Sequence, residues 1–165
     1  LGRLDGLTMT IVGDVLRGRV ARSNILLHQA FGNKVRVVAP PTIAVSEFKE
    51  LGVEVYHEMG PALEGADVVM SLRMKLEYLK DWFVPNLDEY SRKYIVSEPV
   101  LRKYAPDCVV LAPGPIIRGT EITSEVADGP RSLISKQVNN GVAVRMAVLF
   151  LLLSGDESTP SLSDN

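Results

Sequence analysis

Residues 67–73 read Asp-Val-Val-Met-Ser-Leu-Arg, and their pattern is the clearest indication of the fold class. The unbroken apolar run Val68–Met70 predicts a strand at residues 67–72 that is buried on both faces of a parallel sheet. Similar short apolar runs predict further strands at residues 8–12, 35–39, 53–56 and 108–111. Helical signals alternate with these runs. We therefore predict a three-layer α/β fold, in which a doubly wound parallel sheet of about five strands carries helices on both faces.

The helices are predicted from apolar spacing and from capping residues, and they cover residues 20–31, 46–51, 61–64, 97–104 and 124–128. Residues 132–153 are expected to be largely helical, with an interruption near Asn139-Asn140-Gly141. The apolar part of that segment, residues 142–153, is too short to span a bilayer, so we expect a buried helix. We predict one domain over residues 1–154, which includes a long functional loop with some helix at residues 73–90. A disordered tail rich in Ser, Asp and Pro is expected at residues 155–165.

Composition excludes several function classes. The 165 residues carry a net charge of −2, which gives no electrostatic footprint for nucleic acid or for a membrane surface. The only cysteine, Cys108, is expected in the core and cannot form an internal disulfide, which favours a reducing, cytoplasmic setting. No Cys/His or carboxylate cluster indicates a metal site, and His28 and His57 are expected to be structural or exposed.

Chemically distinctive residues follow three of the predicted strands. The three loops begin at Gly13, Leu72 and Ala112. Because the carboxyl ends of parallel strands share one edge of the sheet, these loops should face the same crevice. Arg19 and Arg73 could therefore hold the two carboxylates of a small diacid by paired hydrogen bonds, or they could be surface residues tied to nearby acids. A dinucleotide site is rejected, because the glycine spacing that its fingerprint requires is absent.

Pro113-Gly114-Pro115 forms a rigid corner after the last predicted strand. Proline has no N–H, so the corner leaves carbonyl groups available, and an X-Pro bond there could be cis. The corner either ends the strand or also aims fixed carbonyls at an amine or amide.

Six groups of motifs, in the right order, resemble the second, aspartate-binding domain of the aspartate carbamoyltransferase family. The likeness covers about residues 1–154. The motifs are Gly2–Leu7, Ile11–Asp14 with Gly18–Ser23, Asp67–Arg73, Pro113–Pro115 with Arg118–Ile122, Asp128–Ser132, and Gln137–Arg145.

This resemblance implies transfer of the carbamoyl group of carbamoyl phosphate to the amine of L-aspartate, in pyrimidine biosynthesis, without a metal or organic cofactor. It implies that Arg19 and Arg73 bind aspartate, and that Gly114 and Pro115 contact the carbamoyl group. It also implies a homotrimer whose sites are shared between subunits. The family's carbamoyl-phosphate domain is not found in this sequence, so we expect the chain alone to be inactive and to bind aspartate weakly.

Two positions depart from the family pattern. Lys75 stands where the family has glutamine, and Ala112 stands where it usually has histidine before the proline corner. A protonated lysine only donates hydrogen bonds and would repel a substrate ammonium. The alternative hypothesis is therefore a degenerate, non-catalytic carbamoyltransferase-like protein with a structural or binding role.

Overall fold

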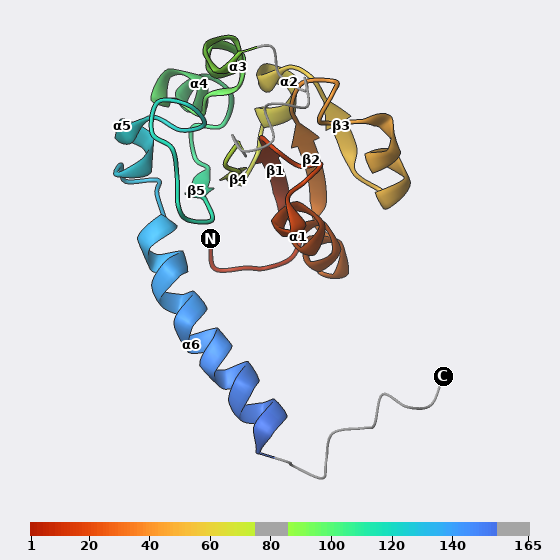
Figure 1. Cartoon of the computed structure of the whole chain (residues 1–165), viewed down its shortest axis with the longest axis vertical. Coiled ribbons are helices and arrows are strands. Elements are labelled where there is room, and N and C mark those ends of the chain that lie inside the picture. Colours follow the sequence, from red (N-terminus) through yellow and green to blue (C-terminus); the bar gives the residue numbers. More distant parts are fainter. Residues whose placement is uncertain (75–85, 155–165) are drawn as a thin grey trace. The chain divides into compact units, whose positions relative to one another are not determined.

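The structure is a computed structural model that describes residues 1–74 and 86–154. Its elements follow one another along the chain (Figure 1) as β1 (Thr8–Val12), α1 (Arg19–Ala30), β2 (Lys34–Val38), η1 (Ser46–Leu51), β3 (Glu54–Tyr56), α2 (Met59–Leu63), β4 (Val68–Ser71), α3 (Leu87–Tyr94), α4 (Glu98–Tyr104), β5 (Val109–Leu111), α5 (Ser124–Ala127) and α6 (Ile134–Leu153). The chain divides into two units, residues 1–134 and residues 135–165.

The first unit contains a five-stranded sheet in the order β3-β2-β1-β4-β5, and all four strand pairings are parallel. The chain moves outward from β1 to β2 and β3, then returns to β4 on the other side of β1 and continues to β5. The order therefore reverses between β1 and β4, where open sheets of this type bind ligands. The predicted α/β fold with a five-stranded parallel sheet is confirmed.

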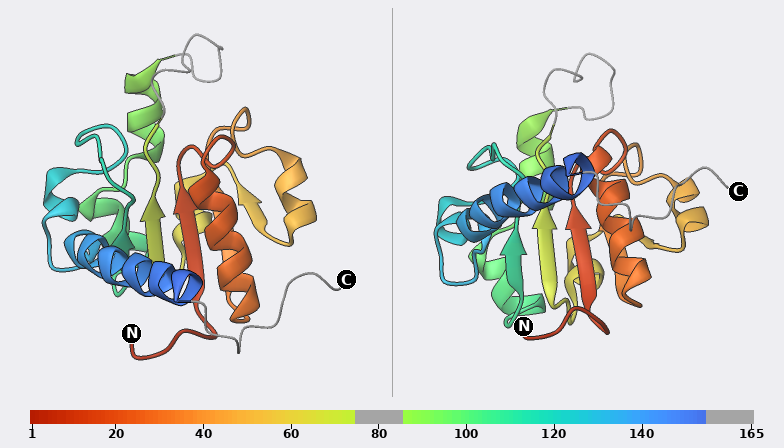
Figure 2. Two further views of the ribbon diagram at one scale, coloured as in Figure 1. Left: turned by 60° about the horizontal axis from the view of Figure 1, so that its bottom comes forward. Right: turned by 90° about the horizontal axis from the view of Figure 1, so that it is seen from below.

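Helices cover both faces of this sheet. Figure 2 shows α1 in front of the sheet and α2 behind it. The chain moves along the sheet in one direction from β1 to β2 and in the other from β3 to β4, so right-handed crossovers place the two connecting helices on opposite faces. The central strands are accordingly apolar on both sides, and all four residues of β4 are buried. Cys108 lies in the same core, and burial raises the pKa of its thiol to about 11.

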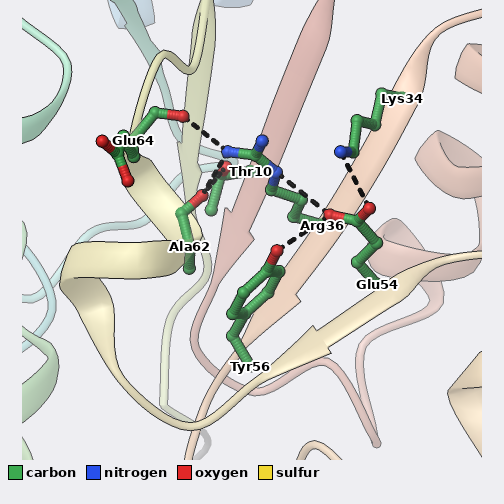
Figure 3. Close-up of polar contacts among 7 residues, drawn as sticks. All are labelled: Thr10, Lys34, Arg36, Glu54, Tyr56, Ala62 and Glu64. Atoms are coloured by element: carbon green, nitrogen blue, oxygen red, sulfur yellow. Dashed lines mark hydrogen bonds and ion pairs between the residues drawn. The ribbon is translucent and has the colours of Figure 1, made fainter.

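Two polar networks fix the periphery of the sheet. The Asn33 side chain accepts a hydrogen bond from the backbone N–H of Leu7 and donates to the carbonyl of Leu4, both at 2.8 Å, so it ties the segment before β1 to the start of β2. Further along β2, the Arg36 guanidinium donates to the carbonyls of Ala62 at 3.2 Å and Glu64 at 2.7 Å (Figure 3).

The Arg36 network also includes a carboxylate. Arg36 Nε donates to Glu54 Oε2 at 3.3 Å, Tyr56 donates its hydroxyl to the same oxygen, and Lys34 Nζ lies 2.8 Å from the other oxygen (Figure 3). Hydrogen bonding from Lys34 is the largest of the effects that lower the pKa of Glu54. One arginine on β2 thus joins β3 to α2, which crosses from β3 to β4.

The last helix differs from its prediction in two respects. Helix α6 runs without interruption through Asn139-Asn140-Gly141, so the predicted break is wrong. Its hydrogen bonds outweigh the weak local preference of two asparagines and a glycine for turns. None of its residues is buried, so the expectation of a buried helix over residues 142–153 is also wrong. An apolar sequence favours burial of a helix, but it does not specify which surface the helix packs against.

Within residues 1–74 and 86–154, no helix is long and apolar enough to cross a membrane. The tail at residues 155–165, and Lys75 with most of the predicted functional loop, lie outside the described residues.

Candidate functional site

The carboxyl ends of three neighbouring strands surround a cavity of about 170 Å³. Strand β1 lies between β2 and β4, and β5 follows β4, so the loops after β1, β4 and β5 meet at one edge. Each of these loops contributes to the cavity wall, which is formed by Asp14, Gly18, Val20, Leu72, Arg73, Pro113, Gly114 and Pro115.

Gly13 lets the first loop approach the second. It has φ of +116°, and a Cβ placed there would lie 2.4 Å from the carbonyl oxygen of Leu72. A Cβ at Gly18 would instead lie 2.8 Å from the carbonyl oxygen of Asp14, within the first loop itself. Arg19 follows Gly18, and Arg73 follows Leu72. The two arginines thus come from loops that touch, on the same edge of the sheet.

The arginines differ in their surroundings. Arg73 is half-buried and lines the cavity. Arg19 is exposed and is the first residue of α1, between two residues of the cavity wall, Gly18 and Val20. Guanidinium groups bind carboxylates by paired hydrogen bonds. Two such groups at one rim can therefore attract a small dianion.

The proline corner forms another part of the wall. The Gly114–Pro115 peptide bond is cis, as the sequence allowed, and Gly114 and Pro115 are exposed at the cavity. Ala112 precedes the corner and is completely buried, and it is not among the residues that line the cavity. The structure therefore brings Arg73, Gly114 and Pro115 together, whereas Ala112 is buried outside the cavity.

A group of buried polar residues next to this cavity was missed by sequence reasoning. Asp14, Ser71, Tyr90 and Glu121 are each about 1% exposed. Burial raises the pKa of Tyr90, and the charges of Glu121 and Asp14 raise it further, so these three residues lie close together. The sequence signals were Asp14 in the first loop and Glu121 in the motif after the proline corner, but neither pattern indicates burial.

The other candidate residues lie away from the cavity. His28 Nδ1 is 3.0 Å from the Asn33 side-chain amide, and burial lowers the pKa of His28. His57 Nδ1 is 3.1 Å from the carbonyl of Ala39. Among residues 1–74 and 86–154, no group of three or more His, Cys, Asp or Glu side chains is placed to hold a metal ion.

Comparisons with known proteins agree with one another. A family model described as "Aspartate/ornithine carbamoyltransferase, Asp/Orn binding domain" matches residues 5–152. The aspartate carbamoyltransferase catalytic subunit of Granulibacter bethesdensis is 51% identical over 161 residues, which are 97% of this chain and 51% of that protein. The corresponding subunit of Xanthobacter autotrophicus is 53% identical over 151 residues, covering 92% and 48%.

A solved structure supports the same assignment. The ornithine carbamoyltransferase of Thermus thermophilus matches with a TM-score of 0.76 at 28% identity, covering 93% of this chain and 50% of that one. The present chain spans about half the length of the curated relatives that it matches.

Proposed function

Because the chain belongs to the Asp/Orn-binding domain family of aspartate and ornithine carbamoyltransferases, we propose that it is the aspartate-binding domain of an aspartate carbamoyltransferase. That domain would extend over residues 1–154. The full enzyme would transfer the carbamoyl group of carbamoyl phosphate to L-aspartate in de novo pyrimidine biosynthesis. The 51% identity to an aspartate carbamoyltransferase catalytic subunit, across 97% of the chain, carries this proposal.

The charge of the cavity rim favours aspartate over ornithine. Arg73 lines the cavity and Arg19 lies beside it. The Asp14 carboxylate in the wall is buried and has Arg17 4.0 Å away, so the rim is cationic where the amino acid would bind. Aspartate has two carboxylates that can pair with the two guanidinium groups. Ornithine carries a second ammonium group, which these arginines would repel. We therefore assign Arg19 and Arg73 to aspartate binding.

The proline corner would orient the other substrate. A corner with two prolines has few N–H donors and presents carbonyl groups, which accept hydrogen bonds from the carbamoyl NH2. We assign Gly114 and Pro115 to this contact. With both substrates held, the aspartate nitrogen attacks the carbamoyl carbon, the new C–N bond forms, the C–O bond to phosphate breaks, and the amine loses a proton. Positioning of this kind needs no cofactor.

This chain does not match about half of the length of its relatives. We assign to that unmatched half the substrate contacts that this chain does not provide. That half would supply the ligands of the phosphate group. We also propose a cytoplasmic homotrimer for the full enzyme, as the resemblance to the aspartate carbamoyltransferase family implies. The relatives are named catalytic subunits, so the comparisons give the non-catalytic alternative no support.

The test is a fusion of this chain to the unmatched half of the Granulibacter subunit, assayed for carbamoyl aspartate beside that subunit in its intact form. We expect activity in the fusion and a loss of about 10²-fold or more for Arg73→Ala, because a charge-stabilising contact disappears. Arg102→Ala is the matched control, because the Arg102 side chain is 74% exposed and lies away from the cavity. If the fusion is inactive and becomes active when Lys75→Gln and Ala112→His are introduced, the hypothesis of a degenerate, non-catalytic protein would be supported instead.

A further inference from the structure

The walls of the candidate site are joined by one buried residue outside the cavity, Glu121. It is 1% exposed and belongs to the segment that returns from the proline corner toward α5. Buried carboxyl groups are rare unless they have partners, because removing them from water costs free energy. The contacts of Glu121 therefore indicate its role.

The backbone of Glu121 binds the end of β4. Ser71, the last residue of that strand, donates its hydroxyl to the Glu121 carbonyl at 3.2 Å. The backbone N–H of Val96 donates to the same carbonyl at 2.9 Å. Ser71 lies two residues before Arg73, so this contact attaches the Glu121 segment to the strand end that carries the arginine.

The side chain of Glu121 binds the proline corner. Its Oε1 accepts a hydrogen bond from the backbone N–H of Ile117, two residues after Pro115. The other oxygen, Oε2, is buried and has no hydrogen-bond partner among the described residues. Burial raises the pKa of this carboxyl, while the Ile117 N–H and the charge of Arg73 act in the opposite direction. The Glu121 carboxyl and the Arg73 guanidinium are thus near enough to interact.

We propose that Glu121 is a positioning residue, which sets the proline corner against the end of β4 so that Gly114-Pro115 and Arg73 face one cavity. The proposal rests on the proposed function only in its choice of ligand. The proposal depends on the length of the Glu121 side chain. Ser71 and Val96 hold the Glu121 backbone, and from there the carboxylate must reach the Ile117 N–H.

Three substitutions in the 165-residue chain separate length from charge. Glu121→Gln keeps the length and an acceptor oxygen but removes the charge, whereas Glu121→Asp keeps the charge and is one methylene shorter. Glu121→Ala removes both. The exposed Glu125→Ala, on α5, is the surface control, and Asn33→Ala is a control that destabilises the chain far from the cavity.

Two measurements decide the outcome. The first is hydrogen exchange of the Ile117 amide by NMR, which we expect to be at the wild-type rate in Glu121→Gln and about tenfold faster in the Asp and Ala variants. The second is calorimetric binding of succinate, a diacid probe, which we expect to weaken about tenfold in the same two variants and to be retained in Glu121→Gln. Both controls should keep the wild-type succinate affinity.

Several results would overturn the proposal. If Glu121→Asp behaves like wild type and Glu121→Gln does not, charge rather than position is what matters. Unchanged Ile117 exchange in Glu121→Ala would also end it. If the wild-type chain binds no succinate, the aspartate-binding proposal fails for this chain, whereas the Ile117 exchange rates still decide the role of Glu121.

Discussion

Gly13 offers the sharpest test of how the two central loops meet. Its φ of +116° is one that residues with a side chain rarely adopt, and a Cβ there would lie 2.4 Å from the Leu72 carbonyl oxygen. The neighbouring Leu72 N–H donates to the Val12 carbonyl at 2.7 Å, so the Leu72 backbone is held in place. The clash therefore cannot be relieved by rotating a flexible side chain.

The cost of Gly13→Ala has two parts. The backbone conformation costs about 1–2 kcal/mol for a residue with a Cβ. Forcing an additional carbon into a packed region costs about 1–3 kcal/mol more. We therefore expect the free energy of unfolding to fall by about 2–5 kcal/mol.

Urea denaturation followed by far-UV circular dichroism measures this loss. Gly65→Ala is the matched control, because Gly65 has φ of +64° but no atom lies within 4 Å of the position that a Cβ would take there. That variant isolates the backbone cost, about 1–2 kcal/mol. If Gly13→Ala lowers stability no more than Gly65→Ala does, the close approach of the β1 and β4 loops is not as described.

Three further predictions concern the polar groups. Arg36→Met should lower the free energy of unfolding by about 1–3 kcal/mol in urea denaturation, because Glu54 and the Glu64 carbonyl lose their guanidinium donor, whereas Thr10 still donates to the Ala62 carbonyl; a loss below about 0.5 kcal/mol would contradict this. Asn33→Ala should cost about 1–3 kcal/mol by the same assay, because a buried N–H loses its acceptor, and an unchanged urea midpoint would refute it. Burial raises the pKa of Glu121 above the ordinary 4.5, so the folded state binds its proton more tightly than the unfolded state does, and stability is lost as the pH rises from about 4.5 through the folded pKa. The stability of Glu121→Gln relative to wild type should therefore rise across that pH window when both are unfolded with urea. A stability difference that does not change with pH would show that Glu121 does not titrate in this way.

The sequence predicted the sheet well because its signals are local. β4 was expected at residues 67–72 and runs over Val68–Ser71, since a continuous apolar run bounded by polar residues specifies a strand without help from distant contacts. The helix at residues 132–153 was predicted less well. Its Asn-Asn-Gly suggested a break, but a propensity of about 1 kcal/mol or less per residue is a weak constraint within a long helix.

The candidate site divides in the same way. Arg19, Arg73 and the proline corner were identified because they follow strands, and parallel topology brings strand ends together. Glu121 could not be identified as buried, because a glutamate normally lies in solvent unless it has a charged partner. Its burial depends on contacts with Ser71, 50 residues away in sequence, and no local pattern encodes such a contact.

The protected thiol of Cys108 has a practical consequence. Thiolate is the form that reacts with maleimides and disulfides, and a pKa of about 11 leaves only about one molecule in 10⁴ ionised at neutral pH. The sulfur is also enclosed by the core, which keeps reagents out. A cysteine introduced on the surface would therefore be the reactive handle of the folded protein, so spectroscopic probes can be attached there without first replacing the natural cysteine.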